Sequence, residues 1–415
     1  MVSAVLFITF FVLLVLNVPI SICLGLSSAA AILYSGTSLT IVATNIYSGI
    51  SKFLLLAIPF FVLSGNIMAK AGISTRLIRF VDTCVGHRKG GIANVCIIVA
   101  CFFGAISGSG PATVAALGAV LIPAMVERGG FSAPFSTALM ATASSIAIVI
   151  PPSIAFVVYA SITGVSIGDM FMAGIVPGIL MGLALIVVVM LEVRKNHVVP
   201  SNVQKASAKE RLDAFKDAFW GFLMPVIILG GIYGGIFTPT EAAAVSVVYG
   251  LFVGMVIYKE VKLKDLWDIL IDSAKTTGGI MLIVACASLF SFVCTRFGIS
   301  AAASQLLAKV AGNQFTFLLI CNVIFLIAGC FIDANSAMYI FIPIMLPVCK
   351  ALGYDIVAFG VMATVNLAIG QVTPPVGVNL FVAISIKIKK GLEVTLQEIS
   401  RAVVPMIAAC VAVLL

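Results

Sequence analysis

The sequence predicts an all-α integral membrane protein made of two similar halves, each with a helical hairpin and a proline-broken helix. Composition gives the first indication: 62% of the 415 residues are hydrophobic and only 10% are charged, which is far from the balance of a soluble domain. Long apolar stretches follow one another, and their lengths suit helices crossing a hydrocarbon core of about 30 Å rather than barrel strands. The third indication is that Pro-Pro pairs occur twice and nowhere else, at Pro151-Pro152 and Pro374-Pro375.

The first half of the chain is expected to alternate spans with one hairpin and one broken helix. Residues 1–16 contain no basic segment of the kind that opens a cleavable signal, so we expect a retained first helix. A polar stretch, Arg194 to Asp217, closes this half. The expected elements are spans near 2–16, 20–36 and 52–69, a hairpin over 91–126, a helix over 132–163 broken at the Pro pair, and a span over 170–192.

The second half repeats this order, with spans near 219–237, 241–258 and 276–295, a hairpin over 315–350, a broken helix over 355–386 and a last span over 399–415. Four landmarks recur in register, which indicates an internal repeat. Five crossings in each half would invert the second copy relative to the first. A hairpin that crossed the membrane fully would add two crossings, which leaves the number odd. The inversion therefore does not decide whether the hairpins are re-entrant. The paired landmarks are Pro19 with Pro239, Gly104 with Gly329, Pro151 with Pro374, and Pro177 with Pro405.

The distribution of basic residues tests this layout independently. If five loop segments lie on the cytoplasmic side, they hold 20 of the 24 Lys and Arg residues, as the positive-inside rule requires. Both termini then face outward, toward the periplasm in a Gram-negative cell. Two short amphipathic segments, Ile73 to Val85 and Ile299 to Val310, are expected to lie in the membrane interface as arms. The five segments are 70–90, 127–131, 193–218, 259–275 and 387–401.

Several functional classes find no support in the sequence. The ten cysteines lie mostly within spans and form no CxxC or His-paired metal pattern. No nucleotide-binding or hydrolase motif is present, so we expect no enzyme and no cofactor, and energy must come from an ion gradient or a partner subunit. The net charge of +8 reflects membrane orientation and does not imply nucleic acid.

The tip of the first hairpin, residues 104–113, is the first candidate site. It reads Gly-Ala-Ile-Ser-Gly-Ser-Gly-Pro-Ala-Thr. Its glycines let the backbone bend and expose carbonyls, and its serines add hydroxyl oxygens, so this tip can coordinate sodium. An ordinary loop between two complete spans is the alternative, and a matching tip in the other half argues against it.

The matching tip is Asp333-Ala334-Asn335-Ser336. Asp333 lies in an otherwise uncharged run, and a carboxylate at bilayer depth is costly unless it has a partner or a role. It could bind a cation or couple to protons, or it could be a solvated turn acid.

The two Pro-Pro pairs are expected to form the opposite wall of each tip. Consecutive prolines interrupt the helical hydrogen bonds in residues 144–153 and 371–379, which frees carbonyls for an ion or substrate. A kink that serves only packing is the alternative, and two such pairs at matched positions make it the weaker one.

Two charged residues on the outward side are further candidates. Arg296 ends a span and could bind a substrate carboxylate in bidentate fashion, although a cation before Gly298 also suits a helix C-terminus. Glu241, which follows Thr238-Pro239-Thr240, suits a helix N-terminus and is a candidate contact for a partner protein.

Together, four segments resemble the large membrane subunit of tripartite ATP-independent periplasmic (TRAP) transporters. They are Ile58 to Gly65, the 104–113 tip, Gly235 to Ala243 and Gln371 to Asn379. The resemblance spans nearly the whole chain and implies an elevator-type secondary transporter with re-entrant hairpins in the bacterial inner membrane. It also implies a soluble periplasmic substrate-binding protein and a small four-helix membrane subunit as partners.

By the same resemblance, sodium is the coupling ion and organic acids are the substrates, chiefly C4-dicarboxylates and sialic acid, with sialic acid favoured on general similarity. Arg296, Ser153 and Asn379 are the candidate substrate residues. A stand-alone sodium/dicarboxylate symporter of the wider inverted-repeat superfamily is the alternative. The candidate sodium ligands are Ser107, Gly108, Ser109, Ser145 and Pro152 for one site, and Asp333, Asn335, Ser336, Thr373, Pro375 and Gly377 for the other.

We expect six segments along the chain. They are 1–90, scaffold helices and cytoplasmic arm; 91–169, hairpin 1 and the first broken helix; 170–218, a span and cytoplasmic linker; 219–312, scaffold helices and outer arm; 313–390, hairpin 2 and the second broken helix; and 391–415, the C-terminal span.

Overall fold

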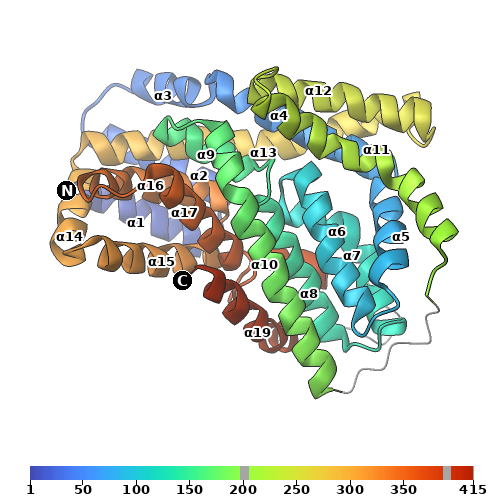
Figure 1. Cartoon of the computed structure of the whole chain (residues 1–415). Coiled ribbons are helices and arrows are strands. Elements are labelled where there is room, and N and C mark those ends of the chain that lie inside the picture. The colour runs from blue at the N-terminus through green and yellow to red at the C-terminus, as the bar shows by residue number, and fades with distance from the viewer. Residues whose placement is uncertain (197–204, 387–393, 415) are drawn as a thin grey trace.

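The computed structural model describes residues 1–196, 205–386 and 394–414, and all regular structure within them is helical (Figure 1). The predicted linker around 197–204 and part of the predicted cytoplasmic segment 387–401 therefore fall outside the described residues. In the first half the helices are α1 (Val2–Val15), α2 (Ile20–Tyr34), α3 (Thr40–Ile50), the short 3-10 helix η1 (Phe53–Leu56), α4 (Ala57–Lys70), α5 (Ile73–Val85), α6 (Gly91–Ser107), α7 (Gly110–Glu127), α8 (Ala133–Ser145), η2 (Ile146–Ile148), α9 (Ile154–Thr163) and α10 (Ile167–Lys195).

The second half has the same order of elements, except that one long helix takes the place of α3, η1 and α4. In it lie α11 (Ala208–Tyr233), α12 (Pro239–Phe252), the π-helical turn η3 (Val253–Ile257), α13 (Leu263–Arg296), α14 (Ile299–Ala311), α15 (Gln314–Phe331), α16 (Ala334–Ala351), α17 (Ile356–Gly370), α18 (Val378–Ile384) and α19 (Leu396–Leu414). Both hairpins, α6–α7 and α15–α16, and both broken helices, α8–α9 and α17–α18, are present as predicted. Both Pro-Pro peptide bonds are cis.

Three helices differ from the sequence prediction. Helix α3 was not predicted, because its polar residues hid a short helix between two apolar runs. Helices α11 and α13 begin in segments predicted as cytoplasmic loops. Helix α11 starts at a capping box formed by Ser207 and Glu210, and at the start of α13 the Asp265 carboxylate accepts from the Lys262 amide at 2.9 Å, so polar residues begin helices that continue into the membrane. Helix α13 has 34 residues, or about 51 Å, and therefore exceeds a hydrocarbon core of about 30 Å.

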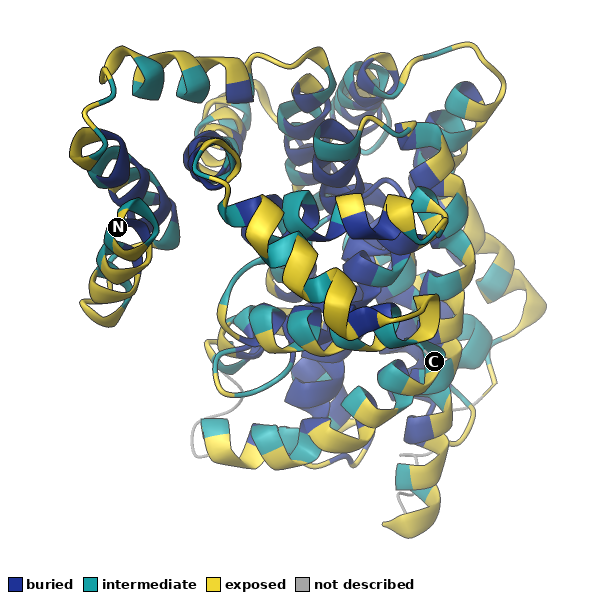
Figure 2. Cartoon of the chain, turned by 90° about the vertical axis from the view of Figure 1, so that its left-hand side faces the viewer, coloured by how far each residue is buried: buried dark blue, intermediate teal, exposed yellow. Residues whose placement is uncertain are grey.

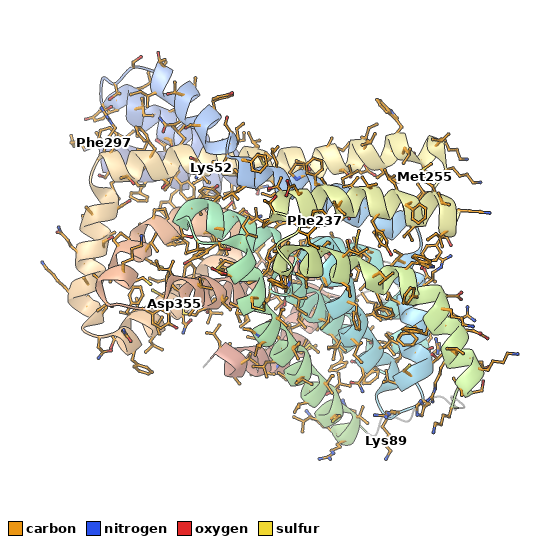
Figure 3. All side chains as sticks on the ribbon, turned by 45° about the horizontal axis from the view of Figure 1, so that its top comes forward. Lys52, Lys89, Phe237, Met255, Phe297 and Asp355 are labelled. Carbon is orange, nitrogen blue, oxygen red and sulfur yellow. The ribbon has the colours of Figure 1, made fainter. Side chains whose placement is uncertain are left out.

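The helices form two packed groups. The scaffold group consists of α1–α4, η1 and α11–η3–α13, in which α4 packs on α12 and α2 packs on α13. The hairpin group consists of α6–α10 and α15–α19, in which α6 and α7 pack on α8, and α15 packs on α17. The arms α5 and α14 join the groups and lie at opposite ends of the molecule (Figure 1). Lys89, just after α5, and Phe297, just before α14, likewise lie at opposite ends (Figure 3), as an inverted repeat requires.

The repeat also appears at the level of single contacts. A Cβ built on Gly104 of α6 would lie 2.8 Å from the Cα of Ala147, and one on Gly329 of α15 would lie 2.9 Å from the Cα of Gly370. These positions correspond in the two halves, so each hairpin crosses its broken helix at a small residue. The crossings bring each hairpin tip to the break beside it.

Burial agrees with a membrane-spanning molecule. The hairpin group holds the deepest buried segments, shown dark blue in Figure 2, while the outer helices carry exposed strips. On α10 the exposed strip is apolar and includes Val176, Leu180, Leu183 and Val187, the pattern of a helix facing lipid. Nine helices within the described ranges are long and apolar enough to cross a membrane. The chain is thus a multi-pass membrane protein.

Candidate functional site

The tip of hairpin 1 is a compact set of hydroxyl and carbonyl oxygens. Helix α6 ends at Ser107, Gly108 takes a left-handed conformation with φ of 62°, and Ser109 is the N-cap of α7. The Ser107 and Thr113 hydroxyl oxygens are 2.8 Å apart, and Thr113 donates to the carbonyl of Ser109 at 2.8 Å. Glycine is needed at 108 because its conformation disfavours a side chain.

The first Pro-Pro break lies directly against this tip. A Cβ on Gly108 would be 2.8 Å from the carbonyl oxygen of Pro152. Ser153 follows, caps α9 by accepting from the Phe156 amide, and donates to the Ile148 carbonyl at 2.5 Å. The structure therefore brings Ser107, Gly108, Ser109 and Pro152 together, with Ser153 beside them.

Ser145 is fully buried at the end of α8 and donates to the Thr142 carbonyl at 2.8 Å. This bond leaves the lone pairs of the Ser145 oxygen available as an acceptor or ligand.

The tip of hairpin 2 is organised by Asp333, the N-cap of α16. One carboxylate oxygen accepts from the amides of Asn335 and Ser336 at 3.0 and 3.2 Å, and the other accepts from the Ser336 hydroxyl at 2.5 Å. The carboxylate is thus stabilised by a helix N-terminus. The side-chain oxygen of Asn335 is buried without a hydrogen-bond partner, which leaves it a candidate ligand.

The second Pro-Pro break supplies backbone oxygens next to hairpin 2. Gly377 takes a left-handed φ of 57°, and its amide donates to the Cys330 carbonyl at the end of α15 at 3.2 Å. The carbonyls of Thr373 and Gln371 lie 3.2 and 3.3 Å from a Cβ built on Gly377. Pro375 lies within this turn, so the predicted residues 373–377 fold back on the hairpin.

The two halves also meet at Gly110, the first residue of α7. A Cβ there would lie 2.8 Å from the side-chain oxygen of Gln371 and 3.0 Å from that of Asn379. Both amide side chains are almost fully buried, and neither oxygen has a hydrogen-bond partner. The nitrogen of Asn379 donates to the Ala141 carbonyl at 3.3 Å. Asn379 therefore sits between α7 and α8, in contact with the first half of the repeat.

A cavity of about 360 Å³ lies between hairpin 1 and the scaffold group, beside the place where α4 meets the hairpin tip: a Cβ built on Gly65 would be 3.3 Å from the Ser107 Cα. On the scaffold side of the cavity, the Asn66 side chain of α4 donates to the Ser273 hydroxyl of α13 at 2.8 Å, which links these two helices. None of the lining residues is charged. They are Val62, Gly65, Asn66, Ala69, Phe103, Ser107, Ser109, Ala112, Ala115, Ala116, Ile154, Thr276 and Ile280.

The remaining predicted residues lie away from the cavity. Arg296 is the exposed last residue of α13. Glu241 is exposed in the first turn of α12, where its carboxylate accepts from the amide and hydroxyl of Thr238, both at 2.8 Å. The structure therefore shows a capping role for Glu241.

Comparison with known proteins identifies the family of this chain. The family model for the tripartite ATP-independent periplasmic transporter, DctM component, matches residues 7–415. The chain belongs to this DctM family. A C4-dicarboxylate TRAP transporter large permease protein, DctM, of Pseudomonas aeruginosa is 42% identical over 86% of this chain and 84% of its own. A sialic acid TRAP transporter large permease protein of Vibrio cholerae is 35% identical over 91% and 87%.

One relative extends far beyond this DctM-family chain. The isethionate TRAP transporter permease protein DctMQ of Oleidesulfovibrio alaskensis is 42% identical over 99% of this chain, which spans only 64% of that relative. Among solved structures, the YdaH transporter of Alcanivorax borkumensis aligns with a TM-score of 0.62 at 14% identity, over 90% of this chain and 86% of its own. That similarity supports the fold. The relatives are named as permeases, as expected for a chain that is not an enzyme.

Three site residues escaped the sequence analysis. Thr113 was inside the first tip but was not selected as a ligand, although its hydroxyl links Ser107 and Ser109. Gln371 and Asn66 were not selected because their neighbours are distant in sequence: Gln371 lies against Gly110, and Asn66 bonds Ser273. For Gln371, an amide side chain at the end of an apolar helix was the available signal.

Proposed function

We propose that the chain is the large permease subunit of a sodium-coupled secondary transporter that imports an organic acid anion across the bacterial inner membrane. The main support is the placement of two hairpin tips, rich in hydroxyl, carboxylate and amide oxygens, against two proline breaks in the interior. Oxygens of this kind are the ligands that hard cations prefer, and backbone at membrane depth is tolerated where it lines such a site.

The first sodium site is assigned to Ser107, Ser109 and Ser145 with the Gly108 and Pro152 backbone, and Thr113 joins it through its hydroxyl. The second is assigned to Asp333, Asn335, Ser336 and Thr373 with the turn at Pro375 and Gly377. The unpartnered Asn335 oxygen supports the second assignment, because a buried amide oxygen without a donor gains stability from a cation ligand.

The substrate is proposed to enter the cavity beside hairpin 1. Because no lining residue is charged, the negative charge of an organic acid would be met by the amide end of α7 and by bound sodium. Ser153 and Asn379 lie behind the tip and stay candidate contacts, while Arg296 is proposed to act earlier, on the outer face. The similarities do not single out sialic acid, since C4-dicarboxylate relatives at 39–42% identity are at least as similar as the sialic acid relative at 35%.

The proposed partners are a small four-helix membrane subunit and a periplasmic substrate-binding protein. The longer DctMQ relative supports the first, because it carries sequence beyond the part that matches this chain. Exposed Glu241 is a candidate partner contact on the outer face. In this scheme the hairpin group moves against the scaffold group as an elevator, and both termini face the periplasm.

Uptake into proteoliposomes tests the proposal. Uptake of radiolabelled C4-dicarboxylate or sialic acid should require an inward sodium gradient, the small subunit and the binding protein together. Uptake by the isolated chain under the same sodium gradient would instead indicate a stand-alone symporter, and uptake without sodium would contradict sodium coupling.

A further inference from the structure

Lys52 joins the scaffold group to the hairpin group by a single polar contact. Its ammonium donates to the carbonyl of Ser161 at 2.6 Å. Within residues 1–196, 205–386 and 394–414, this is the one side-chain hydrogen bond that runs directly from the scaffold group to the hairpin group. Figure 3 labels Lys52 where the scaffold chain passes α9.

The acceptor is a helix end that needs a donor. Ser161 is in the last turn of α9, whose final carbonyls have no partner within the helix. The amide of Gly164 satisfies the Ala160 carbonyl, and Lys52 satisfies that of Ser161. A cation there also interacts favourably with the negative end of the helix dipole.

The same serine connects the contact to hairpin 2. Its hydroxyl lies 3.1 Å from the Tyr339 hydroxyl of α16, and both residues are buried, with exposed fractions of 8% and 4%. Tyr339 is on the helix that Asp333 caps. The Lys52 contact therefore depends on the positions of both α9 and hairpin 2.

A break in the scaffold places the lysine. Helix α3 ends at Ile50, and Lys52 has extended backbone angles of −77° and 127° before η1 begins. The corresponding stretch of the second half is the uninterrupted helix α13. At the matching position, 223 residues later, Lys275 is on the exposed side of α13 and reaches only Asp272, at 3.6 Å. The polar contact is thus made in one half of the repeat alone.

The packing between the groups has the same asymmetry. Helix α13 packs against α16 of hairpin 2, whereas α4 packs on α6 of hairpin 1 and faces α7 across the cavity. Ala69 lines this cavity near the end of α4, and Lys52 precedes the start of the same helix. The two groups are therefore bonded at the Lys52 end of α4, and the cavity extends along α4 to Ala69, near the end that leads into α5 and its arginines.

We propose that Lys52 is a latch that holds the hairpin group in this state, closed on the outer side and open to the cavity on the basic side. The inference rests on the proposed transport cycle, in which the hairpin group slides past the scaffold. Sliding must break the Lys52–Ser161 bond, while the apolar contacts around it can exchange for similar ones. The latch sets how often the outer side opens.

Accessibility of the cavity tests the latch without requiring transport. An Ala69→Cys reporter in the assembled complex is labelled with a membrane-impermeant maleimide from the basic side of oriented vesicles, with the parent protein as background. Lys52→Met should slow this labelling roughly twofold, since losing a hydrogen bond from a charged group shifts a two-state equilibrium by about tenfold, which lowers a state of about 90% occupancy to about 50%. Lys52→Arg, which keeps the donor and charge, should restore most of the rate.

Lys309→Met is the matched control, because Lys309 is an exposed lysine of α14 with no side-chain bond to a described residue. Its labelling rate should equal that of the parent reporter. An unchanged rate in Lys52→Met, or an equal slowing in Lys309→Met, would overturn the latch. Sodium-driven uptake is measured separately, so failure of the latch and failure of the proposed transport are distinguishable.

Discussion

Gly329 of α15 and Gly370 of α17 meet backbone to backbone. A Cβ on Gly370 would lie 2.5 Å from the Cα of Gly329, and one on Gly329 would lie 2.9 Å from the Cα of Gly370. Real Cβ atoms do not approach backbone this closely, so the crossing requires glycine on both helices. In the first half, the corresponding crossing of Gly104 with Ala147 accepts one methyl group. By the distance from the built Cβ to the facing Cα the two crossings are equally close, at 2.8 Å for Gly104 and 2.9 Å for Gly329, so each hairpin needs glycine where it meets its broken helix.

Gly329→Ala should destabilise the protein by about 1–3 kcal/mol, because the methyl group must push α15 away from α17. Thermal unfolding in detergent measures the change. Gly278→Ala on α13 is the control, since nothing lies within 4 Å of the Cβ built there, and alanine favours a helix. If Gly329→Ala unfolds at the parental temperature, the close crossing is not a constraint.

Asp333 both caps α16 and is the proposed sodium ligand, and one substitution separates these roles. Asparagine is a good N-cap but carries no charge, so Asp333→Asn should keep the fold and raise the half-activating sodium concentration about tenfold or more. Sodium titration of uptake measures this. Asp355→Asn is the control, because Asp355 caps α17 in the same way, accepting from the Ala358 amide at 2.7 Å. Equal sodium activation in both variants would remove Asp333 from ion binding.

The sequence predicted the hairpins and broken helices because Gly and Pro act locally: Gly108 and Gly377 do adopt left-handed conformations, and both Pro-Pro pairs interrupt helices. It missed the polar starts of α11 and α13, since Glu210 and Asp265 cap these helix starts without an apolar pattern, and it missed the short α3 because polar residues interrupt its apolar ones. Contacts between residues distant in sequence, such as Asn66 with Ser273 or Gly110 with Gln371, could be found only from the three-dimensional structure. The sodium and substrate roles of all these residues stay predictions until the variants are measured.

Thr113 tests the first sodium site. Thr113→Val keeps the side-chain shape and removes the hydroxyl that links Ser107 to the Ser109 carbonyl, so the half-activating sodium concentration should rise roughly fivefold to tenfold. Thr364→Val is the control, because Thr364 is also fully buried and donates only to the Gly360 carbonyl within its own helix. A parental sodium titration for Thr113→Val would exclude this hydroxyl as a ligand.

Filling the cavity tests whether it is the substrate passage. Ala115 faces the space between α7 and the scaffold wall, so Ala115→Phe should fill part of it and reduce the maximal uptake rate by about an order of magnitude, because the ring would block space that the substrate must cross. Val120→Phe is the control: Val120 is on the same helix, is 47% exposed and does not line the cavity. Sodium-driven uptake into proteoliposomes measures both, with equal amounts of folded protein confirmed by gel filtration. Val120→Phe should transport at the parental rate. If Ala115→Phe does so as well, the substrate does not pass through this cavity.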